Sequence, residues 1–72
     1  MRNYEDILDT KSRDEWIALI GQWIFNEDDR KMIQLYLLDG KRISEIAEEF
    51  NLSVVQTQAR LAKSRNKLFK HI

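Results

Sequence analysis

The sequence predicts an all-α fold of four helices, and three observations lead to that prediction. Apolar residues recur at the i, i+3, i+4 and i+7 spacing of a helix face in four stretches of the chain. A serine followed three residues later by glutamate or glutamine, the signature of a capping box, precedes two of these stretches. The chain has no proline, and only short polar breaks separate the stretches. Its 72 residues make one small domain that packing alone must stabilise.

The N-terminal segment is the least regular part of the pattern. Tyr4, Ile7 and Leu8 have helical spacing, which suits a short helix or an arm laid on the core, but no capping residue precedes them. We therefore assign residues 1–11 to a flexible N-terminal arm and residues 12–72 to a single domain.

The first helix of that domain is expected over residues 13–25, where Ser12 and Glu15 form a capping pair. Asn26 is the expected N-cap of the next helix, residues 27–38, which ends at Asp39-Gly40. Three consecutive acids open that second helix, but successive helical positions point about 100° apart and do not converge on a metal ion. The core face of the first helix consists of Trp16, Ile20, Trp23 and Ile24, and that of the second includes Met32, Ile33, Leu35, Tyr36 and Leu37.

The last two helices have unequal lengths. Ile43 to Phe50 carries a helical apolar pattern of only about two turns. Ser53 and Gln56 then form a second capping pair that opens a long helix ending near residue 69. Its core face is expected to contain Thr57, Leu61, Ser64 and Leu68.

A short helix, a tight turn and a longer basic helix have the proportions of a helix-turn-helix, here residues 43–69. Ala47 is small where the two helices approach each other, and Asn51 is one of the few non-glycine residues that tolerate a positive φ in the turn. Because the long helix begins at Ser53, its N-terminal turns are the part that enters a DNA groove.

Charge is distributed unevenly along a chain whose net charge is zero. Residues 1–39 carry five basic and nine acidic side chains, whereas residues 40–72 carry seven basic and three acidic ones. No carboxylate side chain follows Phe50. A final helix with basic and no acidic side chains is typical of a surface that binds phosphate. The alternative is that these cations only stabilise the helix, because basic residues near a helix C-terminus interact favourably with its dipole. The basic residues of the final helix are Arg60, Lys63, Arg65, Lys67 and Lys70.

Composition argues against several other classes of protein. Cysteine is absent, His71 is the only histidine, and Gly21 and Gly40 form no phosphate-cradling loop, so we expect neither an enzyme nor a protein with a cofactor or metal. The longest apolar runs are about five residues, far short of the roughly 20 that span a bilayer, and no signal peptide is recognisable. A cytoplasmic protein without a membrane partner is expected.

Residues 41–53, KRISEIAEEFNLS, resemble region four, the C-terminal promoter-binding region of bacterial RNA polymerase sigma factors. Residues 60–68 are similar to the basic end of that region's recognition helix, and residues 33–40 also fit, so the resemblance covers about 45 residues. It implies a four-helix, all-α helix-turn-helix domain without a wing. It also implies that double-stranded DNA is the partner in transcription regulation and that RNA polymerase is a second partner.

The sequence departs from that family in three respects. The family usually has glycine at the position of Asn51 and an aliphatic residue at the position of Thr57. The separate domain with which a full sigma factor opens the other promoter element is missing, so we expect a free-standing regulator. Its oligomeric state stays open, and a dimer would predict DNA half-sites about 10 base pairs apart.

The resemblance implies two groups of DNA-contacting residues. Gln58 is suited to bond adenine, whereas Gln56 is as well explained as the capping partner of Ser53. Basic side chains are assigned to phosphates, which position the domain without reading sequence. The expected base-facing residues are Ser53, Val54, Val55, Gln56, Gln58 and Ala59, and the expected phosphate ligands are Lys41, Arg42, Arg60, Lys63 and Lys67.

The alternative to DNA binding is a protein-interaction module that docks RNA polymerase or another regulator. Tryptophans on one helix stripe are more often core than interface, so Phe25, which lies off that stripe, is the aromatic residue expected to be exposed. Val54 and Val55 also favour this alternative, because apolar residues among lysines are suited to a protein partner.

Overall fold

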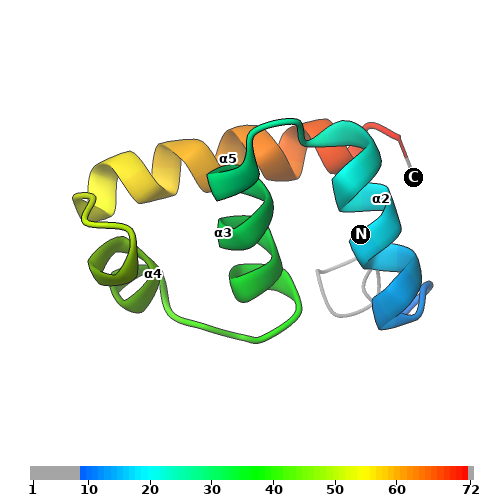
Figure 1. Cartoon of the computed structure of the whole chain (residues 1–72), viewed down its shortest axis with the longest axis horizontal. Helices are drawn as coiled ribbons and strands as arrows, with labels where there is room; N and C mark the ends of the chain where they lie inside the picture. Colours follow the sequence, from blue (N-terminus) through cyan, green and yellow to red (C-terminus); the bar gives the residue numbers. More distant parts are fainter. Residues whose placement is uncertain (1–8, 72) are drawn as a thin grey trace, which may run out of the picture.

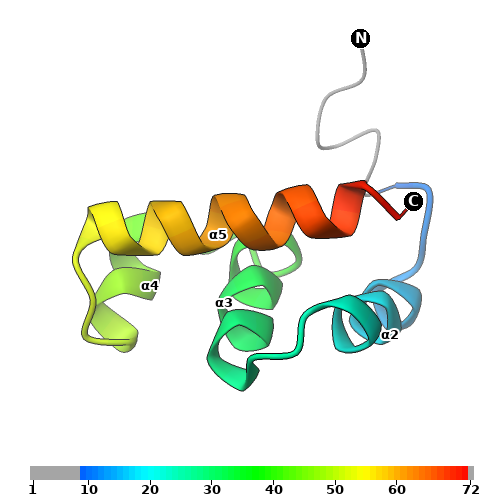
Figure 2. The same cartoon turned by 90° about the horizontal axis from the view of Figure 1, so that it is seen from above.

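The computed structural model describes residues 9–71, so most of the predicted N-terminal arm lies outside the described residues. The described part forms four α-helices: α2 (Arg13–Trp23), α3 (Glu27–Leu37), α4 (Ile43–Glu49) and α5 (Val54–Phe69). Helix α5 runs along the molecule, with α4 under its N-terminal end, α3 under its middle and α2 near its C-terminal end (Figure 1). The same order is visible from above in Figure 2. The all-α, four-helix prediction is confirmed.

Local capping explains where the helices begin. Ser12 Oγ accepts the Glu15 N–H at 3.2 Å, and Glu15 Oε1 accepts the Ser12 N–H at 3.3 Å. The side chain of Asn26 accepts the Asp29 N–H at 3.0 Å at the start of α3. Each cap satisfies backbone donors that have no partner within the first turn of a helix. The expected capping residues are therefore confirmed for α2 and α3.

Helix α2 ends at Trp23, two residues before the predicted end. Ile24 is extended, with φ −106° and ψ 107°, and its side chain is still buried in the core. The Arg30 side chain of α3 donates to the carbonyls of Ile24 and Gly21, which lie at the end of α2. A side chain from the next helix thus satisfies carbonyls that the end of a helix leaves without partners.

The turn between α4 and α5 is a Schellman motif. Asn51 has φ +57°, its N–H donates to the Glu48 carbonyl at 3.3 Å, and the Leu52 N–H donates to the Ala47 carbonyl at 2.8 Å. These two hydrogen bonds, together with the left-handed conformation of Asn51, form a motif that frequently ends helices. The positive φ expected of Asn51 is confirmed.

The core lies where α2, α3 and α4 meet the underside of α5. Thr57 and Ser64 are the buried polar residues among the described ones, and both belong to the predicted core face of α5. Trp23 is only partly buried and stacks on His71, with ring centroids 3.6 Å apart. The buried hydrophobic residues are Trp16, Ile20, Ile24, Met32, Ile33, Leu37, Ile46, Ala47, Leu61 and Leu68.

No helix of residues 9–71 is long and apolar enough to cross a membrane.

Candidate nucleic-acid interface

The first turn of α5 is fixed by its own side chains. Ser53 Oγ accepts the Gln56 N–H at 3.0 Å, and Gln56 Oε1 accepts the Ser53 N–H at 3.0 Å. The capping box is thus complete, and one lone pair of Gln56 Oε1 is engaged by the Ser53 N–H. The cap interpretation of Gln56 is confirmed.

Thr57 anchors the same turn to the core. Its side chain is fully buried, and Oγ1 donates to the Ser53 carbonyl at 2.9 Å. A buried hydroxyl is tolerated because it has this acceptor within its own helix. The cap and the buried threonine therefore hold the first turn of α5 against α4 and leave its outer side open.

The predicted base-facing residues lie on different sides of α5. Val55 is 74% exposed and Val54 45% exposed, and Ala59 is also exposed. At about 100° per residue, Val55 and Ala59 lie nearly opposite the buried face, whereas Gln58 lies about 90° from it. Gln58 lines a cavity of about 240 Å³ on the side of α5 that faces Tyr36 and Ile43. The outermost row of the first two turns is therefore apolar.

Lys63 and Lys67 form a cationic pair on the opposite flank of α5. Both line a cavity of about 160 Å³ next to Phe25, and the Lys67 Nζ lies 4.7 Å from the centre of the Phe25 ring. Phe25 is 70% exposed, which confirms the expectation for this residue. An ammonium over an aromatic face is held by a cation–π interaction, and it still projects into solvent here.

Arg60 lies on the same flank, but it already has partners inside the protein. Its Nε donates to Asp29 Oδ1 at 2.8 Å, and Nη2 lies 3.4 Å from Asn26 Oδ1. The two side chains of this ion pair are 34% and 25% exposed. No signal in the sequence points to this pairing, because the residues are 31 positions apart.

Lys41 and Arg42 are not brought together with Lys63 and Lys67. They belong to the α3–α4 connection, which runs along the edge of the molecule away from α5 (Figure 1). Lys41 lines a cavity of about 300 Å³ that also contains Glu45, Glu48 and Glu49 of α4. Any phosphates bound by the two groups would therefore be different ones.

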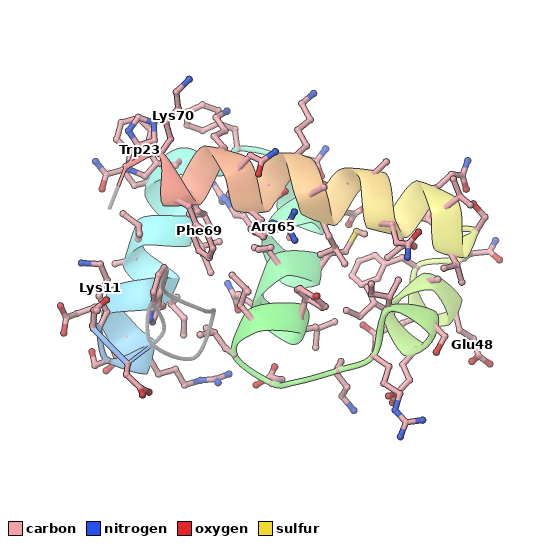
Figure 3. All side chains as sticks on the ribbon, turned by 180° about the vertical axis from the view of Figure 1, so that it is seen from behind. Lys11, Trp23, Glu48, Arg65, Phe69 and Lys70 are labelled. Atoms are coloured by element: carbon pink, nitrogen blue, oxygen red, sulfur yellow. The ribbon has the colours of Figure 1, made fainter. Side chains whose placement is uncertain are left out.

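The outer face of α5 continues toward its C-terminus beyond the predicted residues. Asn66 and Lys70 are exposed, and helical periodicity places both on the side of Val55 and Ala59. Figure 3 shows Lys70 on the outer side of α5 and Arg65 on the side that faces α3. The same spacing rule that identified the core face could have identified Asn66 and Lys70.

Comparison with known families identifies this arrangement of helices. The family model described as "Sigma-70, region 4" matches residues 26–68, which is more than half of the chain. No curated protein and no solved structure matches the chain significantly. The match covers α3, α4 and all but the last residue of α5, and it confirms the predicted sigma region four-like helix-turn-helix. The chain belongs to the sigma-70 region 4 family, whose members are DNA-binding domains that act in transcription.

Proposed function

We propose that the protein regulates transcription by binding double-stranded DNA, with the N-terminal turns of α5 in the major groove. The observation that carries this proposal is the first half of α5, which is capped, exposed on its outer side and without any carboxylate. An exposed helix N-terminus of this kind is the part of a helix-turn-helix that reaches base edges.

Base recognition in this proposal is mostly apolar. Val54, Val55 and Ala59 are suited to contact with thymine methyl groups, which need no hydrogen bond. Gln58 is the glutamine suited to bond adenine bidentately, because the Gln56 side chain is held in the cap by the Ser53 N–H. Ser53 completes the base-facing set at the helix start. Sequence preference should therefore be modest, with a large contribution from DNA shape.

Phosphate contacts supply most of the affinity in this proposal. Lys63 and Lys67 are exposed on one flank of α5, and Lys41 and Arg42 lie before α4, where the first helix of the motif crosses the DNA backbone. Arg60 belongs to the same set, but Asp29 offsets its charge. These contacts position the domain without reading sequence.

A protein-docking module is the second candidate, favoured by the exposure of Phe25 and Val55. The two functions differ in their response to salt. Binding to a random-sequence duplex, followed by fluorescence anisotropy from about 50 to 200 mM salt, should weaken steeply if phosphate contacts dominate. Weak, salt-insensitive binding, together with capture of RNA polymerase without DNA, would favour the docking module instead.

A further inference from the structure

Asp29 is a carboxylate of α3 that reaches the basic flank of α5. Helix α5 has no acidic residue of its own, and Asp29 Oδ1 accepts from Arg60 Nε at 2.8 Å across the α3–α5 contact. The neighbouring Asn26 oxygen lies 3.4 Å from Nη2 of the same guanidinium. The edge of Arg60 formed by Nε and Nη2 is therefore occupied by protein oxygens.

This pairing changes how much charge the flank presents to DNA. A carboxylate oxygen bonds a guanidinium in much the same way as a phosphate oxygen does. The ion pair is net neutral, whereas Lys63, three residues further along α5, forms no ion pair with a carboxylate among residues 9–71. Non-specific affinity for DNA follows the number of phosphates that basic side chains neutralise. Asp29 therefore reduces the effective charge of this surface by about one.

We propose that Asp29 is an internal counterion for Arg60 that limits the affinity of the protein for DNA of any sequence. The inference rests on the proposed DNA-binding function, and it adds to the interface a residue that touches no DNA. Asp29 acts through Arg60 and is thus a positioning residue.

The chain supplies a matched control in the adjacent residue. Asp28 and Asp29 both lie in the first turn of α3, where an anion benefits from the partial positive charge of the helix N-terminus. Asp28 is exposed and, among the described residues, makes no ion pair with a lysine or arginine of α5. Replacing either one by asparagine removes the same charge from the protein, but only Asp29→Asn removes the negative charge that neutralises Arg60.

The test compares Asp29→Asn and Asp28→Asn in the full chain, using anisotropy of a labelled random-sequence duplex. Asp29→Asn keeps an amide oxygen that accepts from Arg60, so the helices should stay packed, which circular dichroism checks. Its affinity at about 0.1 M salt should rise on the order of five- to tenfold, and the log–log salt slope should steepen by about one. Asp28→Asn should change the affinity less than about twofold, because Asp28 is exposed to solvent and, among the described residues, pairs with no basic side chain of α5.

Arg60→Ala completes a double-mutant cycle with Asp29→Asn. It leaves the Asp29 carboxylate without its ion-pair partner on the flank that carries Lys63 and Lys67. Its salt slope should flatten by about one, and the double variant Asp29→Asn/Arg60→Ala should return to about the wild-type slope. Equal or weaker binding by Asp29→Asn, an equal gain in Asp28→Asn, or unfolding of Asp29→Asn would each overturn the inference. The proposed DNA-binding function would survive these results, whereas absence of duplex binding in the wild type would overturn both.

Discussion

At the scale of single residues, two positions depart from the usual sigma region-four pattern, and the structure accounts for both. Asn51 replaces the usual glycine and adopts the same left-handed backbone, at φ +57°. Thr57 replaces an aliphatic residue and stays fully buried because its hydroxyl donates to the Ser53 carbonyl. Asparagine tolerates a positive φ better than most residues, and a buried hydroxyl with an acceptor is not a defect. Neither substitution therefore disturbs the motif.

The buried methyl group of Thr57 should contribute more to stability than its hydroxyl does. Thr57→Val should leave the free energy of unfolding within about 0.5 kcal/mol of wild type, because the Ser53 carbonyl keeps the Thr57 N–H as a donor. Thr57→Ser should lose about 1 kcal/mol, because it removes a buried methyl group and leaves a small cavity. Urea unfolding followed by circular dichroism measures both. A larger loss in the valine variant than in the serine variant would contradict this account.

Gln58 should read one base position. Gln58→Ala should relax preference at a single base pair, at a cost of about 1–3 kcal/mol on the preferred sequence, because it removes a side chain suited to bond adenine. Affinity for random duplex should change little. Selection of bound sequences from a random pool, for the wild type and the variant, measures the preference. A uniform loss of affinity across all sequences would argue against a reading role.

At the scale of helices, local signals in the sequence predict the elements well. Capping pairs and apolar spacing located the starts of α2, α3 and α5, because those signals involve residues no more than a few positions apart. Helix α2 ends at Trp23, two residues before the end that the apolar spacing predicts. Its last carbonyls are bonded by Arg30 of the next helix, and that contact follows from the packing of the two helices rather than from a local motif.

At the candidate interface too, local spacing predicts which residues are exposed but not which distant residues they contact. Helical spacing predicts that Val55, Ala59 and Lys63 are exposed on α5, and the structure agrees. Spacing alone does not reveal that Asp29 pairs with Arg60, or that Lys67 lies over Phe25, because each pair joins distant parts of the chain. A basic residue on a helix was thus predicted from sequence, whereas its partners were not.

Lys63 belongs to the basic flank of α5 and should contact a DNA phosphate. Lys63→Ala should flatten the log–log salt slope by about one unit and weaken binding to all duplexes alike. Lys31→Ala is the control, because this exposed lysine lies on α3 within 3.9 Å of Glu27. It removes the same charge from a different helix. A flattening as large for Lys31→Ala as for Lys63→Ala would show that net charge alone, and not the surface of α5, determines the slope.

At the scale of the whole molecule, α5 connects the core to the proposed interface. Helices α2, α3 and α4 all pack on its inner side (Figure 2), and the outward residues Val55, Ala59, Asn66 and Lys70 are exposed among the described residues. The acidic side chains lie before α5 in the sequence, and α5 itself carries only basic charges. A net charge of zero therefore coexists with a helix suited to phosphate, because the opposite charges belong to different elements.

Amide chemical-shift mapping tests most directly whether the N-terminal turns of α5 enter the DNA groove. On addition of a duplex to isotope-labelled protein, the largest shifts are expected at residues 53–60, with smaller ones at Lys63, Lys67 and the α3–α4 connection. The amides of α2 should change little, because α2 lies near the other end of α5 (Figure 1). Shifts centred on Phe25 and α2, with residues 53–60 unchanged, would contradict the account.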